Sequence, residues 1–152
     1  MRPVLLIAAA LLIGCTPPKP PAPAPEPKVD PTTLSWYAPA VGELEQQQRR
    51  AAELFRAGKS DEASAIITEA QKIEERVLGV PSPTLAAMTA ASDLDDLYGR
   101  MLMANHRYGY ARLLFQKNVT RWKSWKPETP ETLRHLKTAQ TAMAECDRRI
   151  AE

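Results

Sequence analysis

The sequence predicts an all-α protein built from antiparallel helix-turn-helix pairs. From Glu43 onward, apolar residues recur at steps of three and four, and no stretch keeps the period of two that a half-buried strand requires. Glycine, or a hydroxyl residue followed by proline, interrupts this pattern at intervals. Because the interruptions are only a few residues long, we expect consecutive helices to pack as antiparallel neighbours.

The apolar pattern predicts five helices, over residues 43–57, 61–78, 83–103, 106–125 and 130–151. The breaks between them have local causes. Gly58 and Gly79 are expected to end helices in the left-handed backbone conformation. Ser82 and Thr129 each precede a proline, which suits an N-cap hydroxyl followed by proline at the first helical position.

The N-terminal segment resembles the signal of bacterial lipoproteins. Arg2 is followed by ten apolar residues, 4–13, about half of the roughly 20 that a membrane span needs. The letters LIGC, which end at Cys15, match the lipobox, in which a small residue precedes the modified cysteine. The resemblance implies that residues 1–14 are removed as a signal peptide and that Cys15 carries a diacylglyceryl lipid and further acylation, such as palmitate.

Residues 15–33 are predicted to form a lipidated, proline-rich stalk. Eight prolines lie between Thr16 and Pro31, and they disfavour helix and sheet. A polyproline segment extends by about 3.1 Å per residue, so the stalk would reach roughly 50 Å. A ligand for a proline-recognising partner is the alternative. By resemblance to enterobacterial lipoproteins, in which aspartate after the cysteine favours the inner membrane, Thr16 favours the periplasmic face of the outer membrane.

Residues 34–152 are enough for one compact domain. The whole chain has 20 basic and 18 acidic residues, and neither this balance nor export favours a nucleic-acid partner. If lipid occupies Cys15, the other cysteine, Cys146, has no internal partner for a disulfide. Its helical register with Ala139 and Met143 predicts a buried position.

The glycine of the first predicted turn, Gly58, is followed by a small, a large and a small residue, at Ala63, Ile67 and Ala70. Small residues let two helices approach closely, and the large residue fills the space between them. The pattern recurs 48 residues further on, at Asn105 or His106, Ala111, Phe115 and Asn118, with the turn glycine and the second small residue replaced.

These residues resemble the tetratricopeptide repeat. The junctions VLGVPSPTL, from Val77, and KPETPETL, from Lys126, are similar to the linker of kinesin-light-chain-type repeats, the second without its glycine. The resemblance covers residues 43–140 and implies about two helix pairs plus a C-terminal capping helix. Packing from Trp36 and Tyr37, or self-association into a homo-oligomer, is expected to complete the stack. A plain five-helix bundle is the alternative.

In tetratricopeptide proteins, the first helix of each pair lines a groove that receives peptides or helices. Carried over to this sequence, the resemblance implies partner-binding positions on the first and third helices, at Glu45, Gln48, Ala52, Phe55, Asp93, Asp96, Arg100 and Met103. The resulting hypothesis is a non-enzymatic, lipid-anchored scaffold of the cell envelope that binds a protein partner, as pilotin-type lipoproteins or accessory lipoproteins of outer-membrane assembly machines do.

Charge is distributed unevenly along the helices. Residues 43–96 hold 11 acidic and 6 basic side chains, whereas residues 97–127 hold seven basic and no acidic ones. The fourth helix is therefore a second candidate surface for anionic headgroups, an acidic protein, peptidoglycan or a small ligand, through Arg107, Arg112, Lys117, Arg121 and Lys123. The alternative is that the basic stems lie beside the core and their charges reach solvent.

Residue spacing gives no sign of a catalytic or metal-binding site. His106 and His135 have no cysteine or second histidine at ligand spacing, so His135 is expected to be an ordinary surface residue. The aspartates between 93 and 96 lack the glycine turn of a calcium loop, and Asp96 is placed to pair with Arg100 along one helix face. We therefore expect neither an enzyme nor a cofactor other than the lipid on Cys15.

Overall fold

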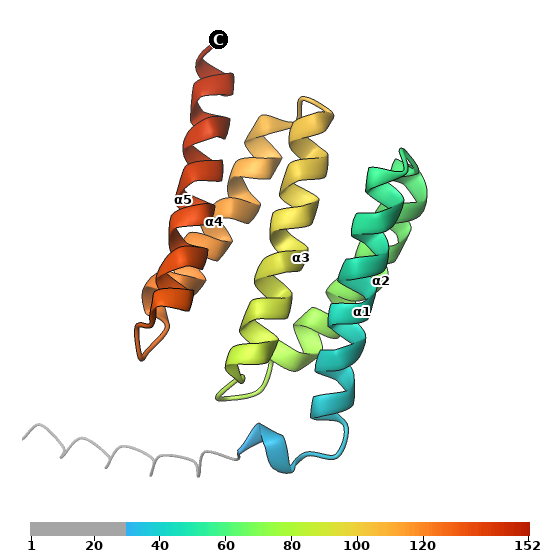
Figure 1. The fold of residues 1–152 in the computed structure, drawn as a ribbon, viewed down its shortest axis with the longest axis vertical. Helices are drawn as coiled ribbons and strands as arrows, with labels where there is room; N and C mark the ends of the chain where they lie inside the picture. The colour runs from blue at the N-terminus through green and yellow to red at the C-terminus, as the bar shows by residue number, and fades with distance from the viewer. Residues whose placement is uncertain (1–29) are drawn as a thin grey trace, which may run out of the picture.

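The computed structural model describes residues 30–152, so Cys15, the predicted signal peptide and most of the predicted stalk lie outside the described residues. The described residues are all-α and contain no strand. A short 3-10 helix, η1 (Pro31–Thr33), precedes five α-helices (Figure 1), which are α1 (Tyr37–Arg56), α2 (Ser60–Leu78), α3 (Leu85–Ala104), α4 (Tyr108–Ser124) and α5 (Pro130–Ala151).

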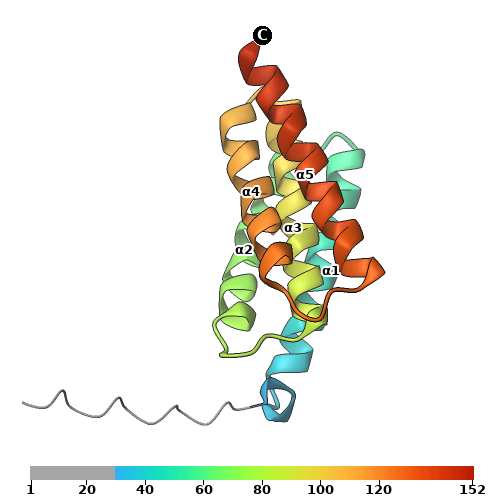
Figure 2. The same ribbon diagram turned by 90° about the vertical axis from the view of Figure 1, so that its left-hand side faces the viewer.

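The five helices form two layers, with α1, α3 and α5 in one and α2 and α4 in the other (Figures 1 and 2). The α1–α2 and α3–α4 pairs are antiparallel, and α3 packs against both helices of the first pair. The fifth helix lies along α4 and contacts α3 only at a few positions. The predicted arrangement of two helix pairs and a further C-terminal helix is thereby confirmed.

The first helix begins earlier than its apolar pattern predicted, at Tyr37 instead of residue 43. Pro39 falls in the first turn, where helix amides have no partner within the helix, so proline is tolerated there. The ring of Tyr37 is 1% exposed, and its hydroxyl accepts a hydrogen bond from the amide of Thr84 at 3.0 Å. Tyr37 thus fills the core and ties the start of α1 to the start of α3.

The turns within the two helix pairs are built alike at positions 48 residues apart. Gly58 has the predicted left-handed conformation, with a φ of +75°, and His106 takes its place in the second pair with a φ of +56°. In each turn the next amide donates a hydrogen bond back to a leucine carbonyl, that of Leu54 at 2.9 Å or Leu102 at 2.8 Å. Matching turn geometry supports the internal repeat found in the sequence.

The junction between α2 and α3 departs from two predictions. Gly79 is right-handed, with a φ of −71°, because its amide continues the helical pattern by bonding to the carbonyl four residues back at 3.0 Å. Thr84, not Ser82, caps α3, because the Thr84 backbone is extended and its hydroxyl accepts a hydrogen bond from the helix at 3.3 Å. The cap at Thr129, followed by Pro130 at the start of α5, is confirmed.

The cores of the two helix pairs differ at one position of close contact. Phe115 of α4 is fully buried, and a Cβ atom on Gly99 of α3 would lie 2.6 Å from the Phe115 Cζ atom. In the first pair, the corresponding positions hold the smaller Ile67 and an alanine, Ala51. The larger ring in the second pair therefore requires glycine on the facing helix.

Buried side chains of α1, α2 and α3 form the larger apolar core, and those of α4 and α5 form a second, smaller one. Cys146 is fully buried there beside Ala111, Phe115 and Ala142, as its register predicted. It is the free cysteine of the described residues, and burial raises the pKa of its thiol. Cys146 therefore packs as a small apolar side chain.

Replacing Gly99 with alanine should destabilise the protein, because the added methyl group would collide with the ring of Phe115. Overpacking of this kind costs about 1–3 kcal/mol, which exceeds the roughly 1 kcal/mol gained in helix propensity. Urea unfolding would measure the change. Gly42→Ala is the matched control, since a Cβ there meets nothing within 4 Å and the variant should be more stable. Equal effects of the two variants would contradict this account.

Candidate functional site

Four charged side chains meet where α2, α3 and α4 come together, and we call them the charge network: Glu74, Asp95, Lys117 and Arg121. The Glu74 carboxylate accepts hydrogen bonds from the Lys117 ammonium at 2.7 Å and from the Arg121 guanidinium at 3.1 Å. The same two cations lie 3.0 and 2.9 Å from the carboxylate of Asp95. Two negative and two positive charges are thus balanced at one place.

Three of these four residues are buried, at 4% exposure for Glu74, 2% for Asp95 and 7% for Arg121. The side chain of Lys117 is 48% exposed and is the member that reaches solvent. Helices α2 and α4 have no Cα pair within 8 Å of each other, so their direct link runs through these long side chains. The charge network is therefore the bridge between the outer helices of the two pairs.

Polar side chains next to the charge network extend it between α3 and α4. Arg121 donates a hydrogen bond to the side-chain oxygen of Asn118, and Asn118 in turn donates to the carbonyl of Ser92 at 2.9 Å. The indole nitrogen of Trp122 donates to the Ser92 hydroxyl at 2.8 Å. Asn118 therefore replaces the small residue of the first pair because it has a hydrogen-bonding role.

The pKa values of two members of the charge network, Glu74 and Lys117, are both raised. Burial, and then the neighbouring charge of Asp95, raise the pKa of Glu74 against the opposing effect of the two cations. Burial alone would lower the pKa of Lys117, but the Asp95 and Glu74 carboxylates outweigh it and raise that pKa. The carboxylates thus outweigh desolvation at Lys117, whereas at Glu74 burial and the charge of Asp95 outweigh the two cations.

The residues predicted to contact an external anion fall into two groups. Arg121 is buried, Lys117 belongs to the charge network, and the Nε atom of Arg112 lies 2.5 Å from Asp147 of α5. Arg107 and Lys123 are exposed and have no ion pair among residues 30–152. Most cations of α4 are therefore paired with acidic residues of other helices.

A groove of about 460 Å³ lies between α3 and α5, and we call it the α3–α5 groove. Its lining residues are Arg100, Met103, Arg134, Lys137, Thr138, Thr141, Ala142, Glu145 and Arg148. Arg148 pairs with Glu145, whereas Arg134 and Lys137 have no ion pair within the described part of the chain. The groove thus combines apolar side chains with two unpaired cations.

Two of the eight predicted partner-binding residues, Arg100 and Met103, line the α3–α5 groove. The predicted helix-surface pair is confirmed, since Arg100 Nε lies 2.6 Å from Oδ2 of Asp96. Asp93 and Asp96 line a smaller adjoining hollow of about 70 Å³. The remaining four predicted residues are half-buried on α1 and do not line the groove: Glu45, Gln48, Ala52 and Phe55.

The α5 side of the groove was missed in the sequence because the resemblance implied binding positions only on the first and third helices. One further prediction about α5 is wrong, since His135 is not an ordinary surface residue. It is half-buried, and its ring stacks on that of Trp122 with centroids 4.7 Å apart and planes inclined by 17°. The stacking joins the start of α5 to the end of α4.

Within residues 30–152, no group of three or more His, Cys, Asp or Glu side chains is placed to hold a metal ion. None of the helices described is both long and apolar enough to cross a membrane. No family model, curated protein or solved structure gives a significant match to this chain. The proposals that follow therefore depend on the geometry of the chain and on its sequence motifs.

Replacing Arg121 with alanine should destabilise the protein strongly, because Glu74 and Asp95 would stay buried with only Lys117 to balance them. Removing one partner of a buried pair costs about 3–5 kcal/mol. Lys123→Ala, at an exposed position on the same helix, should change the free energy of unfolding by no more than about 0.5 kcal/mol. Similar values for both variants would show that the charge network does not hold the helices together.

The raised pKa of Glu74 also predicts how stability depends on pH. Above its ordinary value of 4.5, the folded state binds more protons at Glu74 than the unfolded state, so this group's contribution to stability falls as pH rises. From pH 4.5 upward, the wild-type protein should lose stability relative to Glu74→Gln, measured by urea unfolding at several pH values. Glu75→Gln, an exposed neighbour on α2, is the control. The opposite slope would contradict the assignment.

Proposed function

We propose that this protein is a non-enzymatic, lipid-anchored scaffold of the bacterial cell envelope that binds a protein partner in the α3–α5 groove. The observation that carries the proposal is the pair of unpaired cations, Arg134 and Lys137, beside apolar and hydroxyl side chains of the same groove. Lysine and arginine that no acidic side chain neutralises favour an acidic segment of a partner.

The shape of the groove supports a peptide or helix as the bound element. It runs between two long helices of the same layer, and its lining residues recur along α5 from Arg134 to Arg148. That spacing covers several helical turns, which suits an extended peptide or a helix better than a compact small molecule. The resemblance to tetratricopeptide repeats favours the same mode of binding.

The lipobox motif and the prolines that follow it support the membrane-anchored part of the proposal. A lipid on Cys15 would hold the domain at a membrane, which we take to be the periplasmic face of the outer membrane. The stalk would allow a separation of up to roughly 50 Å. Position near the membrane would then be part of the function, as it is for pilotin-type lipoproteins.

Photo-crosslinking in living cells would test this function. A photoreactive residue at Thr141, which lines the groove, should give an adduct with an envelope protein, whereas one at Thr68, an exposed threonine on α2, should not. Arg134→Glu combined with Lys137→Glu should reduce the Thr141 adduct about tenfold or more, because two charges of the groove are reversed. Arg50→Glu, at an exposed position on α1, should leave it unchanged.

Other outcomes of this experiment would overturn the proposal. Equal adducts from Thr141 and Thr68 would show that contacts are unspecific. Retention on purified peptidoglycan without any protein adduct would favour the alternative of a peptidoglycan-binding lipoprotein. A Cys15→Ser variant that still fractionates with membranes would contradict the lipid anchor, and the groove result would then be judged separately.

A further inference from the structure

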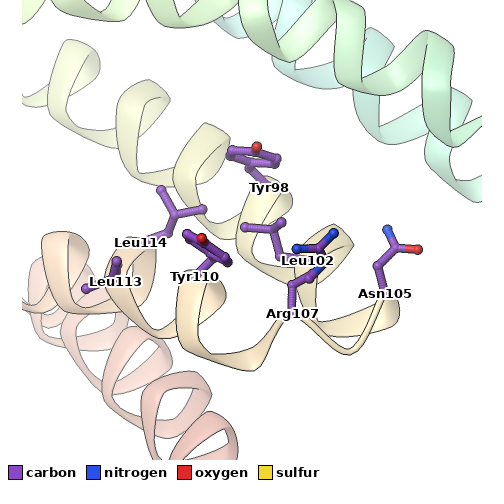
Figure 3. Close-up of a pocket in the computed structure, with 7 residues that line it drawn as sticks. All are labelled: Tyr98, Leu102, Asn105, Arg107, Tyr110, Leu113 and Leu114. Carbon is purple, nitrogen blue, oxygen red and sulfur yellow. The ribbon is translucent and has the colours of Figure 1, made fainter.

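A second groove, of about 740 Å³, lies between the end of α3 and the start of α4. We call it the α3–α4 groove, and its lining residues are Tyr98, Leu102, Asn105, Arg107, Tyr110, Leu113 and Leu114. Five of these seven are apolar or aromatic. Figure 3 shows Tyr98 and Leu102 on one helix opposite Tyr110 and Leu114 on the other.

Two members of this groove are exposed far beyond what is usual for large apolar side chains. Tyr110 is 63% exposed and Leu113 is 62% exposed, and they lie three positions apart on α4. Adjacent exposed apolar residues beside a groove mark a binding surface more often than scattered single ones do. The α3–α4 groove is on a different side of α3 from the groove of the proposed function, which Arg100 and Met103 line.

The charge network that links α2 to α4 contributes no residue to this groove. In the second half of α4, Lys117 and Arg121 reach across to Glu74. Toward the start of α4 no such bridge is present among the described residues, and α2 contributes no side chain to the groove lining. The side of the groove next to the start of α4 is therefore open, and a further helix could lie against α4 there.

The charge of the groove identifies the kind of occupant. Every lining residue belongs to the acid-free segment 97–127, and the groove contains no negative side chain. Arg107 is exposed, has no ion pair among the residues described, and lines the groove together with Leu102 (Figure 3). An apolar surface with an unpaired arginine at its rim complements an apolar face flanked by carboxylates.

We propose that the α3–α4 groove binds an amphipathic helix of a protein partner, with leucine-like residues against Tyr98, Tyr110 and Leu113 and a carboxylate against Arg107. Helices bind apolar grooves through anchors at positions i, i+3 or i+4, and i+7. The occupant is independent of the partner in the α3–α5 groove. The protein would therefore join two partners, one on each side of α3.

The position of the groove favours a protein over a membrane surface. Asp30, where the described chain begins, lies at one end of the helices, and the turn between α3 and α4 lies at the other (Figure 1). A helix of 20 residues is about 30 Å long, so the groove is far from the point where the stalk would enter. This step rests on the lipid anchor of the proposed function, because a domain held at its N-terminal end would present this groove away from the membrane.

Binding of designed peptides would test the inference, with the full chain held in nanodiscs of zwitterionic phosphatidylcholine. The probe is a fluorescent amphipathic peptide of about 14 residues with leucine on one face and glutamate on the others. One control peptide carries lysine in place of glutamate, and a second has the residues of the probe in scrambled order. Fluorescence anisotropy should show preferential binding of the acidic amphipathic peptide. Leu113→Glu and Tyr110→Glu should each weaken it about tenfold or more.

Matched variants separate the groove from general stickiness. Leu133→Glu, at an exposed leucine of α5, should leave peptide binding unchanged, and circular dichroism should show native helix content in every variant. Arg107→Glu should weaken binding of the acidic peptide and strengthen binding of the lysine peptide. Arg134→Glu, in the α3–α5 groove, should not alter binding at the α3–α4 groove, which keeps the two proposals distinguishable.

Three results would overturn the inference. The first is equal binding of the acidic, basic and scrambled peptides to the wild-type chain. The second is displacement of the bound peptide when anionic phosphatidylglycerol is added, which would assign the groove to lipid. The third is self-association in sedimentation velocity that Leu113→Glu abolishes while no peptide binds, which would assign the groove to a second copy of the chain.

Discussion

The charge network at the junction of α2, α3 and α4 links the outer helices of the two pairs, beside the apolar core that joins α3 to α1 and α2. Glu74 and Asp95 are buried with Arg121, and Lys117 completes the balance from the solvent side. Removing charges from water is costly, and a balanced set recovers that cost only when each member keeps its partners. The four residues therefore form one unit, and a change at any of them alters the contact between the pairs.

The second helix pair repeats the first with substitutions that fit this junction. Asn118 replaces alanine and hydrogen-bonds to both Arg121 and Ser92, so it supports the network from within α4. Gly99 leaves space for the ring of Phe115, whereas the first pair, with the smaller Ile67, has space for alanine at the corresponding position. His106 replaces the turn glycine and keeps the left-handed conformation. The departures from the repeat pattern have identifiable physical roles in the second pair.

Much of the fold could be predicted from the sequence because an apolar period near 3.6 depends on local spacing alone. The start of α1 was missed because the apolar pattern was followed only from residue 43, although a proline such as Pro39 is tolerated in a first turn. The candidate site was harder to predict. No local pattern in the sequence marks Arg121 as buried, and its acidic partners lie on other helices, with Glu74 47 positions away. The sequence therefore showed the cations of α4 but not the carboxylates with which they pair. The contribution of α5 to a groove likewise depends on tertiary packing.

The length of the basic side chains in the charge network has a consequence for the whole domain. Apolar contacts would draw α2 and α4 together to the 8–10 Å separation of packed helices, whereas arginine and lysine reach their partners across a wider space. These side chains therefore act as spacers as well as links. No side chain of α2 lines the groove around Tyr98 and Leu113, so the apolar surface there is left uncovered.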